Sequence, residues 1–143
     1  MSRNVVYIAG PIRKGDLLHN IRQADEAMGA LMRAGFSPIN PMLSVYAGCS
    51  TNDQNTSAVY GVWAPADPHA KLVGIGPQDW LEMDLAFVER SDAVLRLPGE
   101  SVGADGEVKH ALENGIPVFY SIEDLIAFFR DPPVTPEMKD ELP

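Results

Sequence analysis

The chain has 143 residues, of which 45% are hydrophobic and 22% charged, and its formal net charge is −9. This length suits a single domain with a substantial core, and the acidic balance argues against broad nucleic-acid binding, which requires a basic face. One cysteine, Cys49, cannot form an internal disulfide and fits a reducing compartment. No apolar run approaches the ~18 residues of a membrane span, and no signal peptide precedes the first apolar run. We therefore expect a cytoplasmic protein without membrane contact.

The first forty residues predict two strands and one helix. Val5–Ala9 is a continuous apolar run rich in β-branched residues, which is typical of a central parallel strand. It ends at Gly10–Gly15, a turn that contains two glycines and two cations. Apolar residues at helical spacing predict a helix over about 17–34, ended by Gly35, and a short strand follows at 36–40.

Residues 42–76 contain a polar run without periodicity. We interpret this segment as a long loop insertion, which in a compact domain is typically a functional lid or a partly disordered segment. Its aromatic residues Tyr60 and Trp63 either stack on a flat ligand or fasten the loop to the core. The sequence leaves both interpretations open.

The second half of the chain predicts two further strands and three helices. Pro77 occupies the favoured first position of a helix over about 78–89, whose predicted core stripe is Leu81, Leu85 and Val88. The remaining elements, in chain order, are a strand at 93–97, a short helix at about 105–114, a strand at 116–120, a helix from Ser121 to about Arg130, and a tail at 132–143.

This alternation of strands and helices predicts an α/β fold over residues 1–131 as one domain. We expect a flavodoxin-like or Rossmann-like three-layer sandwich with a parallel sheet of four to five strands. With strand order 2-1-3-4, the first and third strands are neighbours, and ligands bind beyond their carboxyl ends. The two glycine-containing loops, Gly10–Gly15 and Pro98–Glu107, should therefore face each other across one crevice.

The polar residues expected at this crevice include two acidic groups from different elements. Paired carboxylates suit cleavage of a glycosidic bond, and a glycine loop that leads into a helix can hold an anion. Taken alone, however, Glu107 in the first turn of the 105–114 helix is explained by the helix dipole, and Asp84 by solvation on a helix surface. The expected polar set is Tyr7, Arg13, Lys14, Asp84, Ser101, Asp105 and Glu107.

Three sequence blocks resemble the nucleoside 2-deoxyribosyltransferase superfamily. They are Tyr7-Ile-Ala-Gly-Pro-Ile-Arg-Lys-Gly15, Asp84-Leu-Ala-Phe-Val-Glu-Arg-Ser-Asp-Ala-Val94 and Ser101-Val-Gly-Ala-Asp-Gly-Glu107. They occur in the family's order, and the similarity covers roughly residues 4–41 and 78–120. The first and last blocks are most similar to the 2-deoxynucleoside 5-monophosphate N-hydrolase branch, whereas Pro11 matches the Ala-Gly-Pro of the transferases.

The resemblance implies that Glu107 is a nucleophile that takes the deoxyribosyl group at C1′. Asp84 would position or protonate the sugar–base bond, and Tyr7 would orient the nucleophile. Ser101 and the amides near Gly103 would hold a 5′-phosphate or 5′-hydroxyl. The turn residues that would line the sugar and base are Gly10, Pro11, Ile12 and Arg13.

The activity implied by the resemblance is cleavage of the N-glycosidic bond of nucleosides or their 5′-monophosphates, foremost as a nucleotide N-hydrolase. Base exchange by a transferase is an alternative, and a nucleotide-binding sensor or accessory protein without turnover is another. A weaker similarity, at Leu97-Pro-Gly-Glu100, is to the cytokinin-activating phosphoribohydrolases. The family also implies a homodimer or higher homo-oligomer. We expect no cofactor and no metal, since His19, His69 and His110 lack ligand spacing with Cys49.

Overall fold

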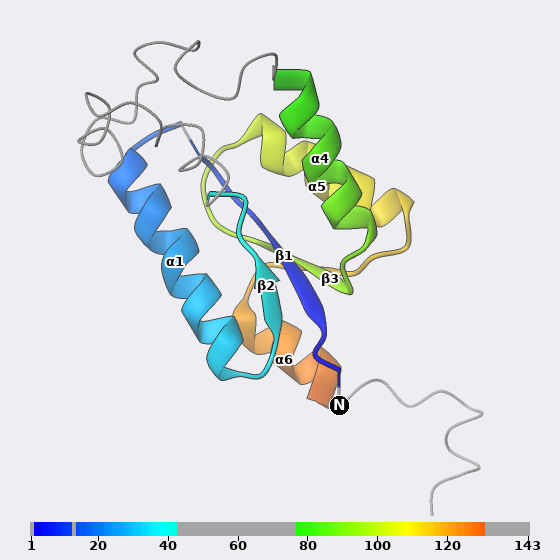
Figure 1. The fold of residues 1–143 in the computed structure, drawn as a ribbon. Coiled ribbons are helices and arrows are strands. Elements are labelled where there is room, and N and C mark those ends of the chain that lie inside the picture. The colour runs from blue at the N-terminus through cyan, green and yellow to red at the C-terminus, as the bar shows by residue number, and fades with distance from the viewer. Residues whose placement is uncertain (1, 13, 43–76, 131–143) are drawn as a thin grey trace, which may run out of the picture.

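The computed structural model describes residues 2–12, 14–42 and 77–130, so the predictions for Arg13, the loop beyond Met42 and the tail lie outside the described residues. Within them, one parallel sheet lies between two helical layers (Figure 1). The predicted α/β sandwich is therefore confirmed. The elements are β1 (Val5–Ala9), α1 (Leu17–Arg33), β2 (Ser37–Ile39), α4 (Pro77–Glu89), β3 (Ala93–Arg96), α5 (Val102–Glu113), β4 (Val118–Phe119) and α6 (Ile122–Arg130).

The four described strands are all parallel and follow the order β2-β1-β3-β4, as predicted. β1 pairs with β3 in a register that sets Tyr7 beside Val94 and Ala9 beside Arg96. Both central strands consequently end at the same edge of the sheet, where the chain enters the loops that precede α1 and α5. This edge is the switch point at which α/β sheets bind their ligands.

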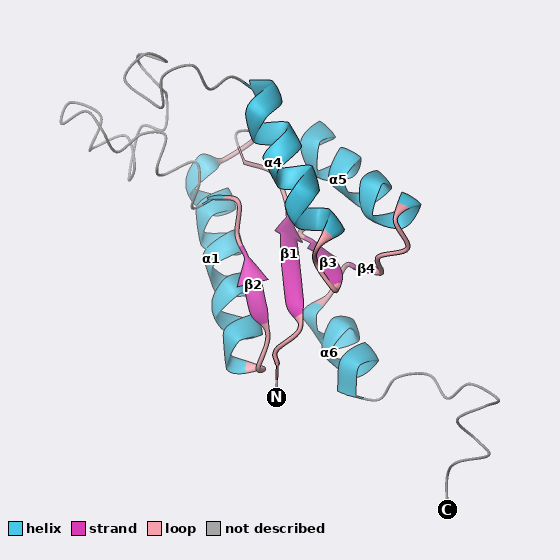
Figure 2. Cartoon of the chain, turned by 45° about the vertical axis from the view of Figure 1, so that its right-hand side comes forward, coloured by secondary structure: helices cyan, strands magenta, loops and turns pink. Residues whose placement is uncertain are grey.

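Alternation along β1 divides the core between the two faces of the sheet. Val6 and Ile8 belong to a cluster with Leu31 of α1 and Leu125 of α6. Tyr7 instead belongs to a cluster that includes residues of α4 and α5. Figure 2 shows the corresponding layers, with α4 and α5 on one side of the strands and α1 and α6 on the other. The period of two in a strand thus sends Tyr7 toward α5.

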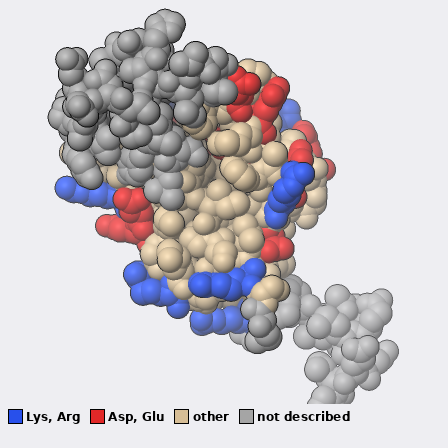
Figure 3. All heavy atoms as spheres, in the orientation of Figure 1, with Lys and Arg blue, Asp and Glu red and all other residues tan. Residues whose placement is uncertain are grey.

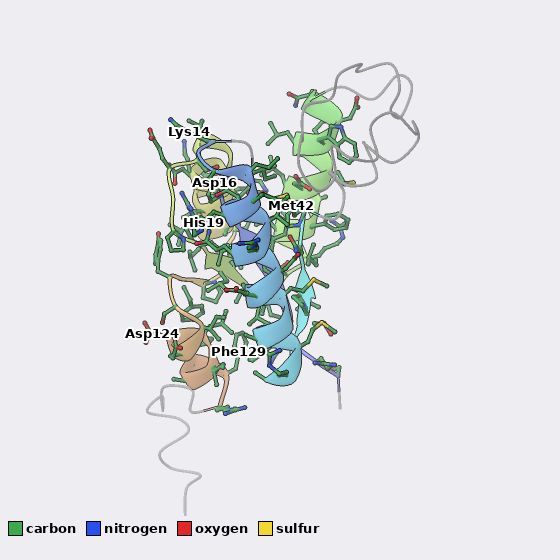
Figure 4. The ribbon with its side chains drawn as sticks, turned by 90° about the vertical axis from the view of Figure 1, so that its left-hand side faces the viewer. Lys14, Asp16, His19, Met42, Asp124 and Phe129 are labelled. Carbon is green, nitrogen blue, oxygen red and sulfur yellow. The ribbon has the colours of Figure 1, made fainter. Side chains whose placement is uncertain are left out.

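Contacts near both ends of α1 fix the layer formed by α1 and α6. Asp16 is the N-cap of α1, and its side chain accepts a hydrogen bond from the His19 amide. At the other end of α1, Phe36 meets Phe129 of α6 edge to face, with ring centroids 5.4 Å apart. Figure 4 shows Asp16 and Phe129 at opposite ends of this layer.

Two details of the sequence prediction are wrong. α5 begins at Val102 and not near Asp105, because Ser101 is the N-cap and its side chain accepts from the Ala104 amide. The glycines at 103 and 106 disguised this start, since glycine is a poor helix former. Leu81 of α4 is also not a core residue, since 42% of it is exposed.

Charged side chains are unevenly distributed over the surface. On the face shown in Figure 3, several Lys and Arg side chains gather at the lower end, near the amino ends of the strands. Arg3 belongs to that end of the molecule and donates to the carbonyl oxygens of Met32 and Gly35, where α1 terminates. Within the described part of the chain, no helix has the length and apolarity to cross a membrane.

Candidate active site

The loop after β1 and the loop after β3 are in direct contact. We call them the first loop (residues 10–16) and the second loop (residues 97–101). A Cβ atom built on Gly10 would lie 3.1 Å from Cβ of Leu97, and one built on Gly99 would lie 2.7 Å from Cγ of Pro11. Gly99 also has a φ of +116°, a conformation that L side chains rarely adopt. The predicted meeting of the two loops is therefore confirmed, and glycine is required where they meet.

Polar contacts fasten the same two loops at their outer side. Lys14 forms an ion pair with Glu100 at 3.0 Å, and Gln23 of α1 donates to the carbonyl oxygen of Pro98 at 3.1 Å. Figure 4 shows Lys14 at the end of the molecule where α1 begins. Both partners of the ion pair are well exposed, so its contribution to stability is small. The ion pair matters for the geometry of the site, because it joins the two loops across the sheet edge.

Tyr7 and Glu107 form a buried pair beside these loops. The Tyr7 hydroxyl donates to Oε2 of Glu107. Tyr7 is fully buried, and Glu107 is 9% exposed. Glu107 shares the buried face of α5 with Ala104 and Ala111, at helical spacing. A carboxylate in this core position is not explained by the helix dipole, and the start of α5 at Val102, earlier than predicted, places it in the second turn.

Asp84 of α4 is the second carboxylate of this site. It is half-buried, and burial raises its pKa to about 6. Its charge acts on both members of the buried pair, since it raises the pKa of Glu107 and that of Tyr7. The structure thus brings together Tyr7, Asp84 and Glu107 from β1, α4 and α5. Asp84 is not the freely solvated charge that its helix position alone suggested.

The pKa of Glu107 is raised to about 7, mainly by burial and also by Asp84. The Tyr7 hydrogen bond and the positive charge of Arg96 act in the opposite direction. With the pKa of Asp84 near 6, the two carboxyls together hold about one proton between pH 6 and 7. Burial also raises the pKa of Tyr7, so its hydroxyl remains a donor at neutral pH. The site therefore offers a carboxylate, an acidic proton and a fixed donor.

Ser101 and Gly103 lie at the N-terminus of α5, whereas the sequence predicted both in the loop before the helix. The Ser101 hydroxyl accepts from the Ala104 amide at 3.1 Å, which leaves its own proton available for another acceptor. Gly103 is exposed in the first turn. The N-terminus of a helix favours an anionic or polar group, so this turn can receive the polar end of a small ligand.

The residues of the first loop differ in their burial and in their contacts. Pro11 is buried against Gly99, whereas Ile12 is half-buried and packs against the core cluster on the α1 side. The carbonyl oxygen of Ile12 also accepts from the Asn20 side chain at 3.2 Å. Pro11 thus supports the meeting of the loops, and Ile12 anchors the first loop to α1. Arg13 lies outside the described residues.

One buried polar residue at this edge of the sheet, Arg96, was missing from the polar set expected from the sequence. It is 8% exposed at the end of β3, and its guanidinium donates to the carbonyl oxygens of Leu97 and Gly99 and to Asp105. The apolar run around it hid the residue, because an arginine in a short strand is easily assigned to a solvent-facing position. A signal was present: an arginine in a strand buried on both faces needs a partner, and Asp105 follows the loop.

His110 lies apart from this site, and the described residues include no candidate metal site. His110 contacts Glu89 at 2.8 Å on the outer side of α4 and α5. Among the described residues, no group of three or more His, Cys, Asp or Glu side chains could hold a metal ion.

The fold is similar to that of a 2-deoxyribosyltransferase. This enzyme, from the psychrotolerant bacterium Bacillus psychrosaccharolyticus, is a biocatalyst for the synthesis of antiviral and antitumoral nucleosides. The two chains share 15% sequence identity with a TM-score of 0.52, over 96% of this chain and 82% of the other. No protein-family model and no curated protein matches the chain in sequence. The similarity is therefore one of fold, and the activity must be argued from the site.

Proposed function

We propose that this protein cleaves the N-glycosidic bond of 2′-deoxynucleosides or their 5′-monophosphates. The observation that carries the proposal is the buried hydrogen bond from Tyr7 to Glu107, with Asp84 acting on both groups from α4. A buried carboxylate beside a second acidic group costs folding stability, so its placement in the core calls for a chemical purpose. The similar fold of a 2-deoxyribosyltransferase supports the same class of reaction.

In the proposed first step, a carboxylate oxygen of Glu107 forms a bond to C1′ of the sugar. The bond between C1′ and the base nitrogen breaks, and the base leaves with the electron pair. Asp84 supplies a proton to the departing base or orients it, while the Tyr7 hydroxyl holds the other oxygen of Glu107. Positive charge that develops on the sugar ring is stabilised by the adjacent carboxylate.

In the second step, water attacks C1′ of the glycosyl ester and releases Glu107 as a carboxylate. This yields the free sugar or its 5-phosphate, and the proton of the attacking water passes to a carboxylate or to solvent. The polar 5′ end of the substrate lies at the N-terminus of α5, near Ser101 and Gly103. Pro11 and Gly10 line the opposite side of the site.

A free base is a second candidate acceptor for the deoxyribosyl group. Two observations favour it: the similar fold belongs to a transferase, and the turn at Pro11 resembles the Ala-Gly-Pro of the transferases. In that case the base nitrogen attacks C1′ of the ester in place of water. The first step, with Glu107 and Asp84 in the same roles, is unchanged.

The proposal is tested by incubating the purified protein with 2′-deoxynucleosides and their 5′-monophosphates, with and without a second base. Release of the base alone indicates hydrolysis, and a new nucleoside indicates transfer. We expect Glu107→Ala to lower kcat by roughly 10³-fold or more. The matched control is Glu113→Gln on the exposed side of the same helix, which removes one carboxylate and should leave kcat unchanged.

Retained activity in a folded Glu107→Ala variant would contradict the nucleophile assignment. Binding of these compounds without any release of base would instead support a sensor without turnover. Calorimetric titration with the same panel separates this case from a protein that recognises none of them.

A further inference from the structure

Arg96 is a buried cation that the proposed reaction does not use directly. Only 8% of the residue is exposed, although β3 is otherwise apolar. A buried guanidinium is costly unless its donors are satisfied. In this chain its Nη1 and Nη2 groups donate to two backbone carbonyls and one carboxylate. The question is why a buried strand should end in this residue.

The partners of Arg96 all belong to the segment that leads from β3 to Glu107. Nη1 donates to the carbonyl oxygen of Leu97, and Nη2 donates to that of Gly99 at 2.9 Å and to Oδ1 of Asp105 at 3.0 Å. One side chain thus joins the end of the strand, the tip of the second loop and the first turn of α5. The planar fork of arginine suits such a three-part contact, whereas the single ammonium of lysine does not.

The same segment is held from its other side by the first loop. Gly99, whose carbonyl Arg96 binds, has no room for a side chain because Pro11 lies against it. Asp105 is two residues before Glu107, so a shift of this turn would move the Glu107 carboxylate relative to Tyr7. The position of Glu107 therefore depends on contacts that Arg96 makes.

We propose that Arg96 is a positioning residue, which fixes the second loop and the first turn of α5 and thereby sets the place and ionisation of the Glu107 carboxylate. This inference rests on the proposed function in one respect only, that Glu107 is the reacting group. The contacts themselves are independent of it.

Charge supports the geometric argument. Within residues 2–12, 14–42 and 77–130, three charged or titratable groups act on Glu107: Tyr7 from β1, Asp84 from α4 and Arg96 from β3. Asp84 disfavours the anion, while the Tyr7 hydrogen bond and the Arg96 charge favour it. Asp105 of α5 partly neutralises Arg96 through the ion pair. Arg96 is accordingly the cation that opposes the burial and repulsion felt by Glu107.

The test compares two substitutions that separate charge from geometry. Arg96→Gln removes both, so the carboxyl of Glu107 should titrate about one pH unit higher and kcat should fall at least about tenfold. Arg96→Lys keeps a charge but not the fork, so the titration should stay near that of the wild type while kcat falls. The matched control, Arg90→Gln at the exposed end of α4, removes one cation and should change neither.

The ionisation of Glu107 is followed by carbon NMR of the side-chain carboxyl, which is independent of turnover. This readout keeps the inference distinct from the proposed function: a protein without activity can still show or lack the shift. A folded Arg96→Gln variant with an unchanged titration, or with unchanged kcat in an active enzyme, overturns the inference.

A second variant covers the case in which Arg96→Gln does not fold. Asp105 is 71% exposed at its side chain, so Asp105→Asn is tolerated more easily. It frees Arg96 from its counter-charge, and the Glu107 titration should then move to lower pH. A titration that stays in place or moves to higher pH in this variant contradicts the inference.

Discussion

At the scale of single residues, the site is defined by what each neighbour does to Glu107. Burial and Asp84 raise its pKa, and Tyr7 and Arg96 lower it. The influences of Tyr7, Asp84 and Arg96 come from three different elements, β1, α4 and β3. A carboxyl whose pKa is raised to about 7 is balanced between its acid and its anion near neutral pH, so small changes in its surroundings should alter activity measurably.

Removal of the Tyr7 hydroxyl and removal of the Asp84 charge should shift the pH dependence of the reaction in opposite directions. In Tyr7→Phe the lost hydrogen bond no longer favours the anion, so the acidic limb of kcat/KM should move to higher pH. In Asp84→Asn the lost repulsion favours the anion, so that limb should move to lower pH. Shifts of about one unit are expected, and both variants should lose kcat. The measurement is a pH profile of kcat/KM for each variant.

The control for these profiles is Glu82→Gln, an exposed change of charge on α4 beside Gln78. Its acidic limb should match that of the wild type. Shifts of the same sign in Tyr7→Phe and Asp84→Asn would refute the assigned directions.

At the scale of elements, the site depends on how closely two loops approach. Gly99 combines a positive φ with a near contact to Pro11, so Gly99→Ala should strain the backbone and push the loops apart. We expect a loss of about 2 kcal/mol in the free energy of unfolding, measured by urea denaturation. The control is Gly106→Ala within α5, where an added Cβ meets no atom within 4 Å and the helix should be stabilised.

A double variant tests whether contact with Pro11 is the cause. Pro11→Ala removes the Cγ atom that the new side chain would meet, so Pro11→Ala with Gly99→Ala should lose less stability than the two single changes added together. Strict additivity would assign the whole loss to the φ of Gly99 alone.

Most of the element pattern was accessible from the sequence, because it follows from short-range physics. The apolar run Val5–Ala9 and the helical spacing of apolar residues in α1 each reflect burial of one side of the element. The alternation of strands and helices predicted a parallel sheet, and its strand order is that of the expected flavodoxin-like arrangement. The start of α5 was misplaced because a capping serine before two glycines gives a weak local signal. Arg96 was missed because two of its three partners are backbone carbonyl groups, which no residue type indicates, and the third, Asp105, lies beyond the second loop.

The grouping of Tyr7, Asp84 and Glu107 was predictable from the sequence only in part. The strand order predicted that they lie around one crevice, and the resemblance to a known superfamily implied roles for them. The burial of Glu107 could not be deduced locally, because it depends on the exact turn of α5 that faces the sheet. Such information is tertiary, and it came from the structure.

At the scale of the whole molecule, charge is arranged unequally around the sheet. The basic side chains visible in Figure 3 gather largely at the lower end, and there Arg3 binds the carbonyl end of α1. The edge of the sheet where the two loops meet lies at the opposite end, and there Glu107 is buried and Asp84 half-buried. The negative net charge of the chain and these carboxyls oppose ionisation of Glu107, so the site costs stability.

The stability of the whole protein should therefore depend on pH through Glu107. Its pKa is raised from 4.5 to about 7 on folding, so the folded state binds the proton more tightly than the unfolded state. The stabilisation from this proton is complete below pH 4.5 and is lost as the pH rises through about 7. Glu107→Gln cannot ionise, and its amide oxygen can still accept from Tyr7. This variant should gain about 3 kcal/mol relative to the wild type between pH 4.5 and 8.

Urea denaturation at a series of pH values measures this difference directly, with Glu113→Gln as the exposed control on the same helix. In the control the difference from the wild type should stay small at every pH, because its carboxylate is solvated in both states. A constant difference between Glu107→Gln and the wild type would mean that Glu107 ionises as easily in the folded chain as in the unfolded one. The buried carboxylate would then lack the energetic cost that the proposed chemistry exploits.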